Sequence, residues 1–417
     1  MIRPERRTRG DLLAAAAIAA VVALMITAVW WHSSVRSTEF HPGTGTVPSP
    51  SAAPAVPARL QQHWTAPSAR TLAPVVIGGT VVTGDGRTMA GLDLQTGQQR
   101  WSYARDRELC GVSYVYDLAV AVYPDRRGCG QVSGIQAATG HRGPTRTSYA
   151  DGVVVLTSDG GAVLSTGATR LELWRSDLVR MLSYGEIDAP VKPVNTKLGA
   201  GCTLMSAAGS ESAVGVLEAC KGEKDLRLTL IKPAKEEDEP DTKRVSLPGL
   251  PIDAEARVLA VIGTTTAVYL PVPRPVVVVY DDTGTKLSET PAPATPVFGA
   301  VPAVTRAGDM LTWWTGRSLM VFDSKLAYRY TVDGDGPLAP VGPAAMMAGR
   351  LLVPVAEGLA VYATADGVRE RVVPLAHPAG TGPVLPAVAG ETVIEQRDAT
   401  VAAYRPDAGG AGKGPDA

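Results

Sequence analysis

The residues in this 417-residue chain with the clearest chemistry are its four cysteines, Cys110, Cys129, Cys202 and Cys220. An even number of cysteines suggests disulfides, and four allow three pairings. We expect Cys110–Cys129 and Cys202–Cys220, because each pair closes a local loop of about 20 residues, worth roughly 3 kcal/mol in the chain-entropy model. A zinc site is the alternative, but it usually needs closer spacing, such as C-x₂₋₄-C. The pattern therefore predicts structural disulfides and an oxidising compartment.

Other reactive residue types form no recognisable site. The sequence has neither a phosphate-binding G-x-x-x-x-G-K-[ST] loop nor a G-x-S-x-G nucleophile elbow. The Asp333-Gly-Asp335-Gly stretch lacks the further acidic ligands of a calcium loop, so we expect a plain turn. The five histidines are scattered: His32, His41, His63, His141 and His377. We therefore predict no catalytic, metal-binding or cofactor-binding residues.

Three further stretches have two interpretations each. The acidic run 235–239 is either a solvated loop or a docking site for a basic partner. Residues 169–175, TRLELWR, are either a strand edge or a docking patch around a tryptophan that looks exposed. Trp313-Trp314 is expected to pack in a strand, with stacking on a cofactor as the alternative.

The overall composition limits the partner classes. The formal net charge is −1, so no global field attracts nucleic acid, and we expect none to bind. The 44 Gly and 33 Pro punctuate the chain with turns. This favours short strands over long helices.

The N-terminal region reads as a membrane anchor. Residues 12–31 contain no charge and are long enough to cross the bilayer hydrocarbon at 1.5 Å per residue. Four arginines precede this segment within residues 1–11, so the positive-inside rule places that tail in the cytoplasm. A cleaved signal peptide is the alternative, but its apolar region is usually shorter, and Trp30-Trp31-His32 is a poor cleavage site.

The remaining boundaries follow from composition. Residues 32–59 are rich in Pro, Ser, Thr, Ala and Gly, which predicts a semi-extended linker that holds the next domain off the membrane. Residues 60–406 form the main domain. Residues 407–417 are Gly-rich, and we expect a disordered tail.

Within the main domain a strand–turn pattern recurs, most clearly over residues 75–101, VVIGGTVVTGDGRTMAGLDLQTGQQRW. Its blade-like motif consists of Gly91, Asp93, Thr96, Gly97 and Trp101. The Asp and Thr can hydrogen-bond turn backbone, Gly97 can adopt a positive φ, and the Trp offers a large apolar face.

This stretch resembles the β-propeller repeat of pyrroloquinoline quinone (PQQ) enzymes and their relatives, whose motif is A-x-D-x-x-T-G-x-x-x-W; here Gly91 replaces the Ala. Weaker copies follow at roughly 40–50-residue spacing, the period of a propeller blade. We predict an all-β propeller of about eight four-stranded blades, with seven as the alternative count and a pair of β-sandwiches as the alternative fold. Ring closure predicts that the segment 64–76 meets the segment 393–404.

The resemblance also suggests what the domain does. The quinone-dependent enzymes carry a vicinal Cys-Cys pair, which this chain lacks, so it looks more like the non-enzymatic, membrane-anchored actinobacterial type and the outer-membrane-assembly propeller lipoprotein. We expect an extracytoplasmic scaffold without a cofactor that binds an envelope protein. The alternatives are a sensor that binds a ligand in the propeller channel, and a PQQ-dependent dehydrogenase.

Overall fold

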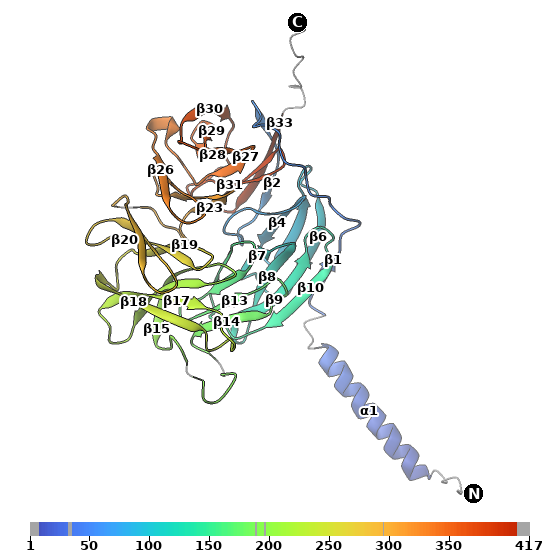
Figure 1. The fold of residues 1–417 in the computed structure, drawn as a ribbon. Coiled ribbons are helices and arrows are strands. Elements are labelled where there is room, and N and C mark those ends of the chain that lie inside the picture. The colour runs from blue at the N-terminus through green and yellow to red at the C-terminus, as the bar shows by residue number, and fades with distance from the viewer. Residues whose placement is uncertain (1–7, 32–35, 188–189, 196, 295, 407–417) are drawn as a thin grey trace.

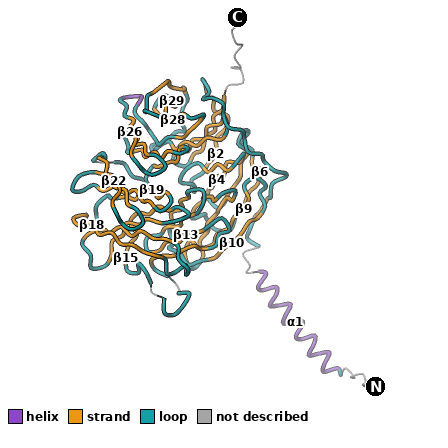
Figure 2. Tube along the Cα trace, viewed as in Figure 1, coloured by secondary structure: helices purple, strands orange, loops and turns teal. Residues whose placement is uncertain are grey.

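The computed structural model describes residues 8–31, 36–187, 190–195, 197–294 and 296–406. Over these residues the chain forms one long helix followed by eight small antiparallel sheets. The sheets follow one another around a ring, as Figure 1 shows, and Figure 2 shows that strands and loops make up nearly all of it. The prediction of an eight-bladed β-propeller is therefore confirmed.

Each blade has four strands, and the bounds are as follows. Blade 1 contains β3 (Val75–Ile77), β4 (Thr80–Asp85), β5 (Thr88–Asp93) and β6 (Gln99–Ala104), with β1 (Glu39–His41) added outside β6. Blade 2 contains β7 (Gly111–Val115), β8 (Leu118–Asp125), β9 (Gly128–Gln136) and β10 (Arg142–Thr147). Blade 3 contains β11 (Val155–Ser158), β12 (Val163–Thr166), β13 (Arg170–Trp174) and β14 (Arg180–Gly185). Blade 4 contains β15 (Cys202–Gly209), β16 (Val214–Cys220), β17 (Asp225–Lys232) and β18 (Asp241–Pro251).

The second half of the ring repeats this order. Blade 5 contains β19 (Arg257–Ile262), β20 (Thr265–Leu270), β21 (Val276–Tyr280) and β22 (Lys286–Pro291). Blade 6 contains β23 (Val304–Ala307), β24 (Met310–Trp314), β25 (Leu319–Phe322) and β26 (Tyr328–Val332), and a short 3₁₀ turn, η1 (Gly336–Leu338), follows it. Blade 7 contains β27 (Ala345–Met347), β28 (Arg350–Val355), β29 (Gly358–Ala363) and β30 (Arg369–Pro374). Blade 8 contains β31 (Leu385–Ala389), β32 (Thr392–Arg397), β33 (Thr400–Pro406) and β2 (Leu60–Pro67).

The ring is closed by pairing the two ends of the domain. β2 lies antiparallel to β33, with Trp64 opposite Ala403, so blade 8 combines the first and last strands of the propeller. The predicted meeting of the two terminal segments is confirmed. Closure also covers the blade faces that a linear row would leave open at its two ends, and each blade keeps only short, protected edges.

Antiparallel order divides the connections between two faces. In each blade the first-to-second and third-to-fourth strand turns lie at one end, and we call this the hairpin face. The second-to-third turns and the connections between blades lie at the opposite end, which we call the loop face. The two faces therefore present different parts of the sequence.

The core lies between neighbouring blades, so both faces of a blade's inner strands are buried. One cluster joins Met89 and Trp101 of blade 1 to Val112 and Ala121 of blade 2. Burying a side chain of this size contributes roughly 1.5–3 kcal/mol. This packing explains why strands such as Val276–Tyr280 are continuously apolar rather than alternating.

The helix α1 (Arg9–Trp31) has no buried residue in the described structure. Thr8 caps it, with its hydroxyl accepting a hydrogen bond from the Asp11 amide and its own amide donating to the Asp11 carboxylate. By length and composition the helix could cross a membrane, and a signal sequence would pass the same test. Arg3, Arg6 and Arg7 lie outside the described residues.

The segment expected to be a free spacer lies against the propeller instead. β1 pairs with β6, the amide of Val47 donates to Ala138 of blade 2, and Arg371 of blade 7 donates to the Val56 carbonyl. Proline-rich backbone has few internal hydrogen bonds, so its carbonyls are free to bond to the blades. The described part of the linker, residues 36–59, therefore forms a strap across the hairpin face of blades 2, 1, 8 and 7. The predicted tail, residues 407–417, lies outside the described residues.

Candidate interaction surface

The blade motif of residues 91–101 forms a tight turn followed by a wedge between blades. Asp93 accepts hydrogen bonds from the amides of Gln95 and Thr96 at 3.0 Å each, and from the Thr96 hydroxyl at 3.1 Å. Gly97 then adopts φ +70°, which residues with a side chain rarely do. The turn directs Trp101 back into the interblade core, where its side chain is 1% exposed.

Gly91 and Gly140 make room for this tryptophan. A Cβ on Gly91 would lie 2.1 Å from the indole ring, which explains why Gly rather than Ala occupies this position in the motif. On the other side, the indole lies on Gly140 of blade 2, and its Nε1 donates to the Ala137 carbonyl at 2.8 Å. The motif therefore joins blade 1 to the β9–β10 turn of blade 2.

The same contact recurs where the sequence motif has degraded. Trp64 of blade 8 lies on Gly97 and donates to the Leu94 carbonyl at 3.2 Å. Tyr330 of blade 6 lies on Gly367 of blade 7, and its hydroxyl donates to the Thr364 carbonyl at 3.0 Å. An aromatic ring on a turn glycine is thus a repeated device for joining blades.

Both predicted disulfides form, each within one blade. Cys110–Cys129 joins the start of blade 2 to β9, and Cys202–Cys220 joins the directly paired ends of β15 and β16. The predicted pairing is confirmed. Cys202–Cys220 links the two strands of a hairpin, whereas Cys110–Cys129 spans the three strands β7 to β9. The described residues contain no free cysteine.

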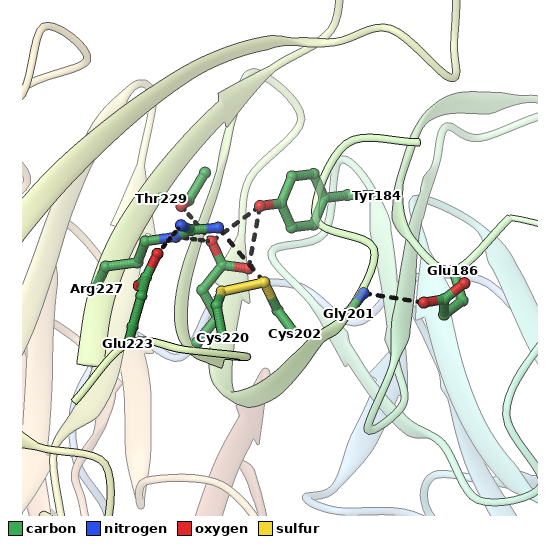
Figure 3. Close-up of a disulfide and its surroundings, with 9 residues drawn as sticks. Tyr184, Glu186, Gly201, Cys202, Cys220, Glu223, Arg227 and Thr229 are labelled. Carbon is green, nitrogen blue, oxygen red and sulfur yellow. Dashed lines mark hydrogen bonds and ion pairs between the residues drawn. A yellow bond between two sulfur atoms is a disulfide. The ribbon is translucent and has the colours of Figure 1, made fainter. Parts of the chain in front are cut away.

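A buried carboxylate lies beside the second disulfide. Glu218 is 0% exposed and accepts hydrogen bonds from Tyr184, Arg227 and Thr229. Burial, together with the Glu218 charge, raises the pKa of Tyr184 to about 12. Figure 3 shows Tyr184, Arg227 and Thr229 gathered around the bridge. Glu218 and the two sulfurs lie close enough to hold a metal ion, but sulfurs joined to each other offer no thiolate, so this group is structural.

Residues 169–175 form the buried strand β13 rather than a docking patch. Trp174 is 1% exposed, and its Nε1 donates to Glu172 at 2.9 Å. Glu172 also binds three guanidinium groups, those of Arg146, Arg170 and Arg180. Burial alone would raise the pKa of Glu172, but the three positive charges outweigh it and lower that pKa. The cluster holds β10, β13 and β14 together.

The acidic run is occupied within the chain rather than free for a basic partner. Glu236 pairs with Lys192, Glu237 with Arg180, and Asp238 is 3% exposed and accepts from Asn195. The run lies in the connection from β17 to β18 and bonds back to blade 3. Docking of a basic partner on these three carboxylates is therefore disfavoured.

Trp313 and Trp314 take the packing role expected for them. Trp313 is 0% exposed and stacks on Phe298 with ring centroids 6.2 Å apart, while Trp314 donates to the Pro340 carbonyl at 2.7 Å. Asp335 immediately precedes η1, and Arg317 lies 3.5 Å from its carboxylate.

His377 makes contacts that the sequence did not indicate. Its side chain is 6% exposed, with Nδ1 2.8 Å from Glu395 and Nε2 2.7 Å from the Val355 carbonyl. Burial alone would lower the pKa of His377, but its contacts with Glu395 raise it. The pair joins the connection between blades 7 and 8 to β32. A lone histidine among prolines gives no periodic signal that could have revealed this.

The loop face carries several exposed apolar side chains. They include Leu72, Tyr149, Val153, Ile252, Val272 and Val297, and Val191 and Val194 are also exposed in the connection from blade 3 to blade 4. Val153 is 81% exposed and Val297 is 55% exposed. The hairpin face is partly covered by the strap, through contacts such as those of Ser49 with Gly78 and of Pro50 with Gly390.

A hollow runs along one side of blade 5, from Val272 near the loop face to Tyr280 and Lys286 near the hairpin face. It has a volume of about 370 Å³, within the usual range for ligand pockets, and is lined by Val272, Pro273 and Val276 among others. Its rim is charged, with Glu289 accepting from both Arg274 and Lys286. These two cations lower the pKa of Glu289, so the rim carries one negative and two positive charges. Such a hollow suits a partner side chain that combines an apolar body with a polar end.

Comparisons with known proteins give a likeness of fold only. No family model matches the chain, and no curated protein matches it. Among solved structures, the computationally designed Ika8 protein is 14% identical with a TM-score of 0.49, over 87% of this chain and 100% of that one. Sqt1 of Saccharomyces cerevisiae is 11% identical with a TM-score of 0.49, over 88% and 100%. The Pan2 WD40 domain of Neurospora crassa is 13% identical with a TM-score of 0.42, over 72% and 89%. At such identities no activity or partner carries over to this chain.

Proposed function

We propose that this protein is a membrane-anchored, extracytoplasmic β-propeller that acts as a non-catalytic interaction scaffold in the cell envelope. The apolar, exposed α1 supports the anchor, and the arginines before it support a cytoplasmic N-terminus. The two disulfides support an oxidising compartment for the propeller.

The observation that carries the scaffold proposal is the difference between the two faces. The hairpin face exposes Tyr116, Val179 and Val368 but is partly covered by the strap, whereas the loop face exposes apolar side chains around the ring. The hollow of blade 5 runs between the two faces. Loops on a rigid propeller can vary without disturbing the interblade core, which suits a binding surface. We therefore place the envelope-protein partner on the loop face.

We also propose that the chain is related to the PQQ-like repeat proteins in their non-enzymatic form. Support comes from the contact of an aromatic ring with a turn glycine, which recurs at Trp64, Trp101 and Tyr330. Glu172 in blade 3 and Glu218 in blade 4 each pair with arginines of the propeller. This pairing fits a structural use of the two carboxylates.

Site-specific photo-crosslinking in intact cells tests the scaffold proposal. A photo-reactive amino acid at Val153, on the loop face, should give a small reproducible set of crosslinked envelope proteins. The matched control is Val368, which is 58% exposed in a turn of the hairpin face and should give no such set. Equal crosslinking from both positions, or none from Val153 and neighbouring loop-face positions, would contradict a partner on the loop face.

A further inference from the structure

The chain between α1 and the propeller is short. α1 ends at Trp31 and β1 begins at Glu39, so only residues 32–38 separate them. Fully extended, seven residues span at most about 25 Å. The strap provides no additional length, because β1 is hydrogen-bonded to β6. If α1 crosses a bilayer, as proposed above, the outer edge of blade 1 must stay close to the lipid head groups.

The position of Arg36 further shortens the distance between the end of α1 and the propeller. Its guanidinium lies 3.9 Å from the ring centroid of Trp31 and 5.3 Å from that of Trp30. Tryptophans at a helix end mark the head-group region of a membrane. β1 begins three positions after Arg36, and Figure 1 shows α1 leaving the ring beside β1 and β10.

The edge that faces the membrane under this geometry carries arginines stacked on aromatic rings. Arg142 lies 5.0 Å from the Phe40 ring and 5.6 Å from the Tyr103 ring. Arg105 lies 5.5 Å from the Tyr123 ring, which itself contacts Tyr103 at 6.0 Å. We call this group, with Arg36 and Arg87, the β1 edge.

The β1 edge has an excess of positive charge. Its four arginines face one carboxylate within the group, that of Glu39, which lies 3.0 Å from Arg87. Among the residues that the structure describes, Arg36, Arg105 and Arg142 make no ion pair. Of the neighbouring carboxylates, Asp125 pairs with Arg127 and Glu108 with Arg70. Asp85 and Asp106 are also nearby in sequence, so the four arginines of the β1 edge still outnumber the unpaired carboxylates beside them.

The chemistry of these side chains suits phosphate. A guanidinium that lies over a ring can still direct N–H groups outward, and these match the geometry of phosphate oxygens. Because the aromatic ring already restrains the arginine side chain, less side-chain entropy is lost when phosphate binds. A lipid head group is the phosphate source that the short tether brings to this edge.

We propose that the β1 edge binds anionic lipid head groups of the leaflet in which α1 ends. This proposal rests on the membrane anchor of the proposed function. Because β1 lies on the circumference of the ring, such binding holds the propeller edge-on to the membrane. Both faces then remain open to the side, and the loop face stays accessible to a partner.

The test compares lipid binding of full-length variants in detergent by native mass spectrometry, with phosphatidylglycerol or phosphatidylcholine added. Wild type should retain phosphatidylglycerol at least about tenfold more tightly than phosphatidylcholine, roughly 1.4 kcal/mol. The double variant Arg105→Gln/Arg142→Gln should lose most of this preference. The double variant Arg105→Lys/Arg142→Lys should show an intermediate preference, because the charge remains but the guanidinium geometry over the rings is lost.

A matched control removes the same charge elsewhere. Arg317→Gln/Arg329→Gln changes two exposed arginines of blade 6, across the ring, and should leave the preference unchanged. Equal preference in wild type and Arg105→Gln/Arg142→Gln would overturn the proposal. Flotation with liposomes after carbonate treatment then distinguishes failure of the anchor from failure of the lipid site. If all variants float, the anchor stands and only the lipid site fails. If none floats, both the anchor and the lipid site fail.

Discussion

Replacing Trp101 with Ala removes the wedge that joins blades 1 and 2. The ring is 1% exposed, and truncating a buried Trp to Ala typically costs about 3–5 kcal/mol. The hydrogen bond from Nε1 to the Ala137 carbonyl adds about 1 kcal/mol. That carbonyl is not left alone, because Thr80 also donates to it at 3.1 Å, so no further penalty for an orphaned acceptor is expected. We expect a loss of about 4–6 kcal/mol.

The assay is equilibrium unfolding of the full-length protein in detergent by urea, followed by tryptophan fluorescence and circular dichroism. Trp101→Phe should keep most of the packing and cost only about 1–2 kcal/mol. Leu287→Ala, at a side chain that is 56% exposed on β22, is the surface control and should change stability by less than about 0.5 kcal/mol. A loss below about 1 kcal/mol for Trp101→Ala would refute the wedge.

Two further predictions concern the Glu172 ion-pair cluster and the two disulfides. Glu172→Gln leaves three buried guanidinium groups without their shared carboxylate, and we expect a loss of about 3–5 kcal/mol near pH 7. Because the folded pKa of Glu172 is lowered, its contribution is present above the usual carboxyl pKa and is lost as pH falls through the folded value. The stability difference from wild type, measured by urea unfolding, should therefore shrink in acid, and a difference independent of pH would contradict this. Reducing the two disulfides should cost roughly 3 kcal/mol each, since they close loops of 19 and 18 residues. Alkylation of the unfolded, unreduced protein should add no mass, and labelled thiols there would contradict the bridges.

The features that sequence predicted best are those with local chemistry. The turn of Asp93, Thr96 and Gly97 depends on neighbours within a few residues, so its residue types specify it. The disulfide pairs are also local, and the period of the repeat implied a closed ring. Later blades were harder to recognise because Tyr330 replaces the motif's tryptophan and keeps only its contact with a turn glycine.

The features that sequence missed depend on residues that meet only in the folded ring. Arg146, Glu172 and Arg180 come from three strands, and their charges look solvent-exposed when read along the chain. A clue exists, since Arg170, Glu172 and Trp174 share one face of a strand. In a propeller both faces of an inner strand pack against neighbouring blades, so that face is buried. Composition likewise predicted a semi-extended linker and missed the strap. Proline-rich segments pack through backbone groups, and composition does not report these contacts.

The most direct test of the account is the side of the membrane on which the propeller lies. Ser324→Cys places an exposed thiol in the turn between β25 and β26, and Thr8→Cys places one before α1. The measurement is labelling of both variants in intact cells with a membrane-impermeant maleimide. We predict that Ser324→Cys is labelled at once and that Thr8→Cys is labelled only after permeabilisation. The opposite pattern, or a labelled propeller that has lost residue 8 and is released from the membrane by carbonate, would contradict a membrane-anchored extracytoplasmic scaffold.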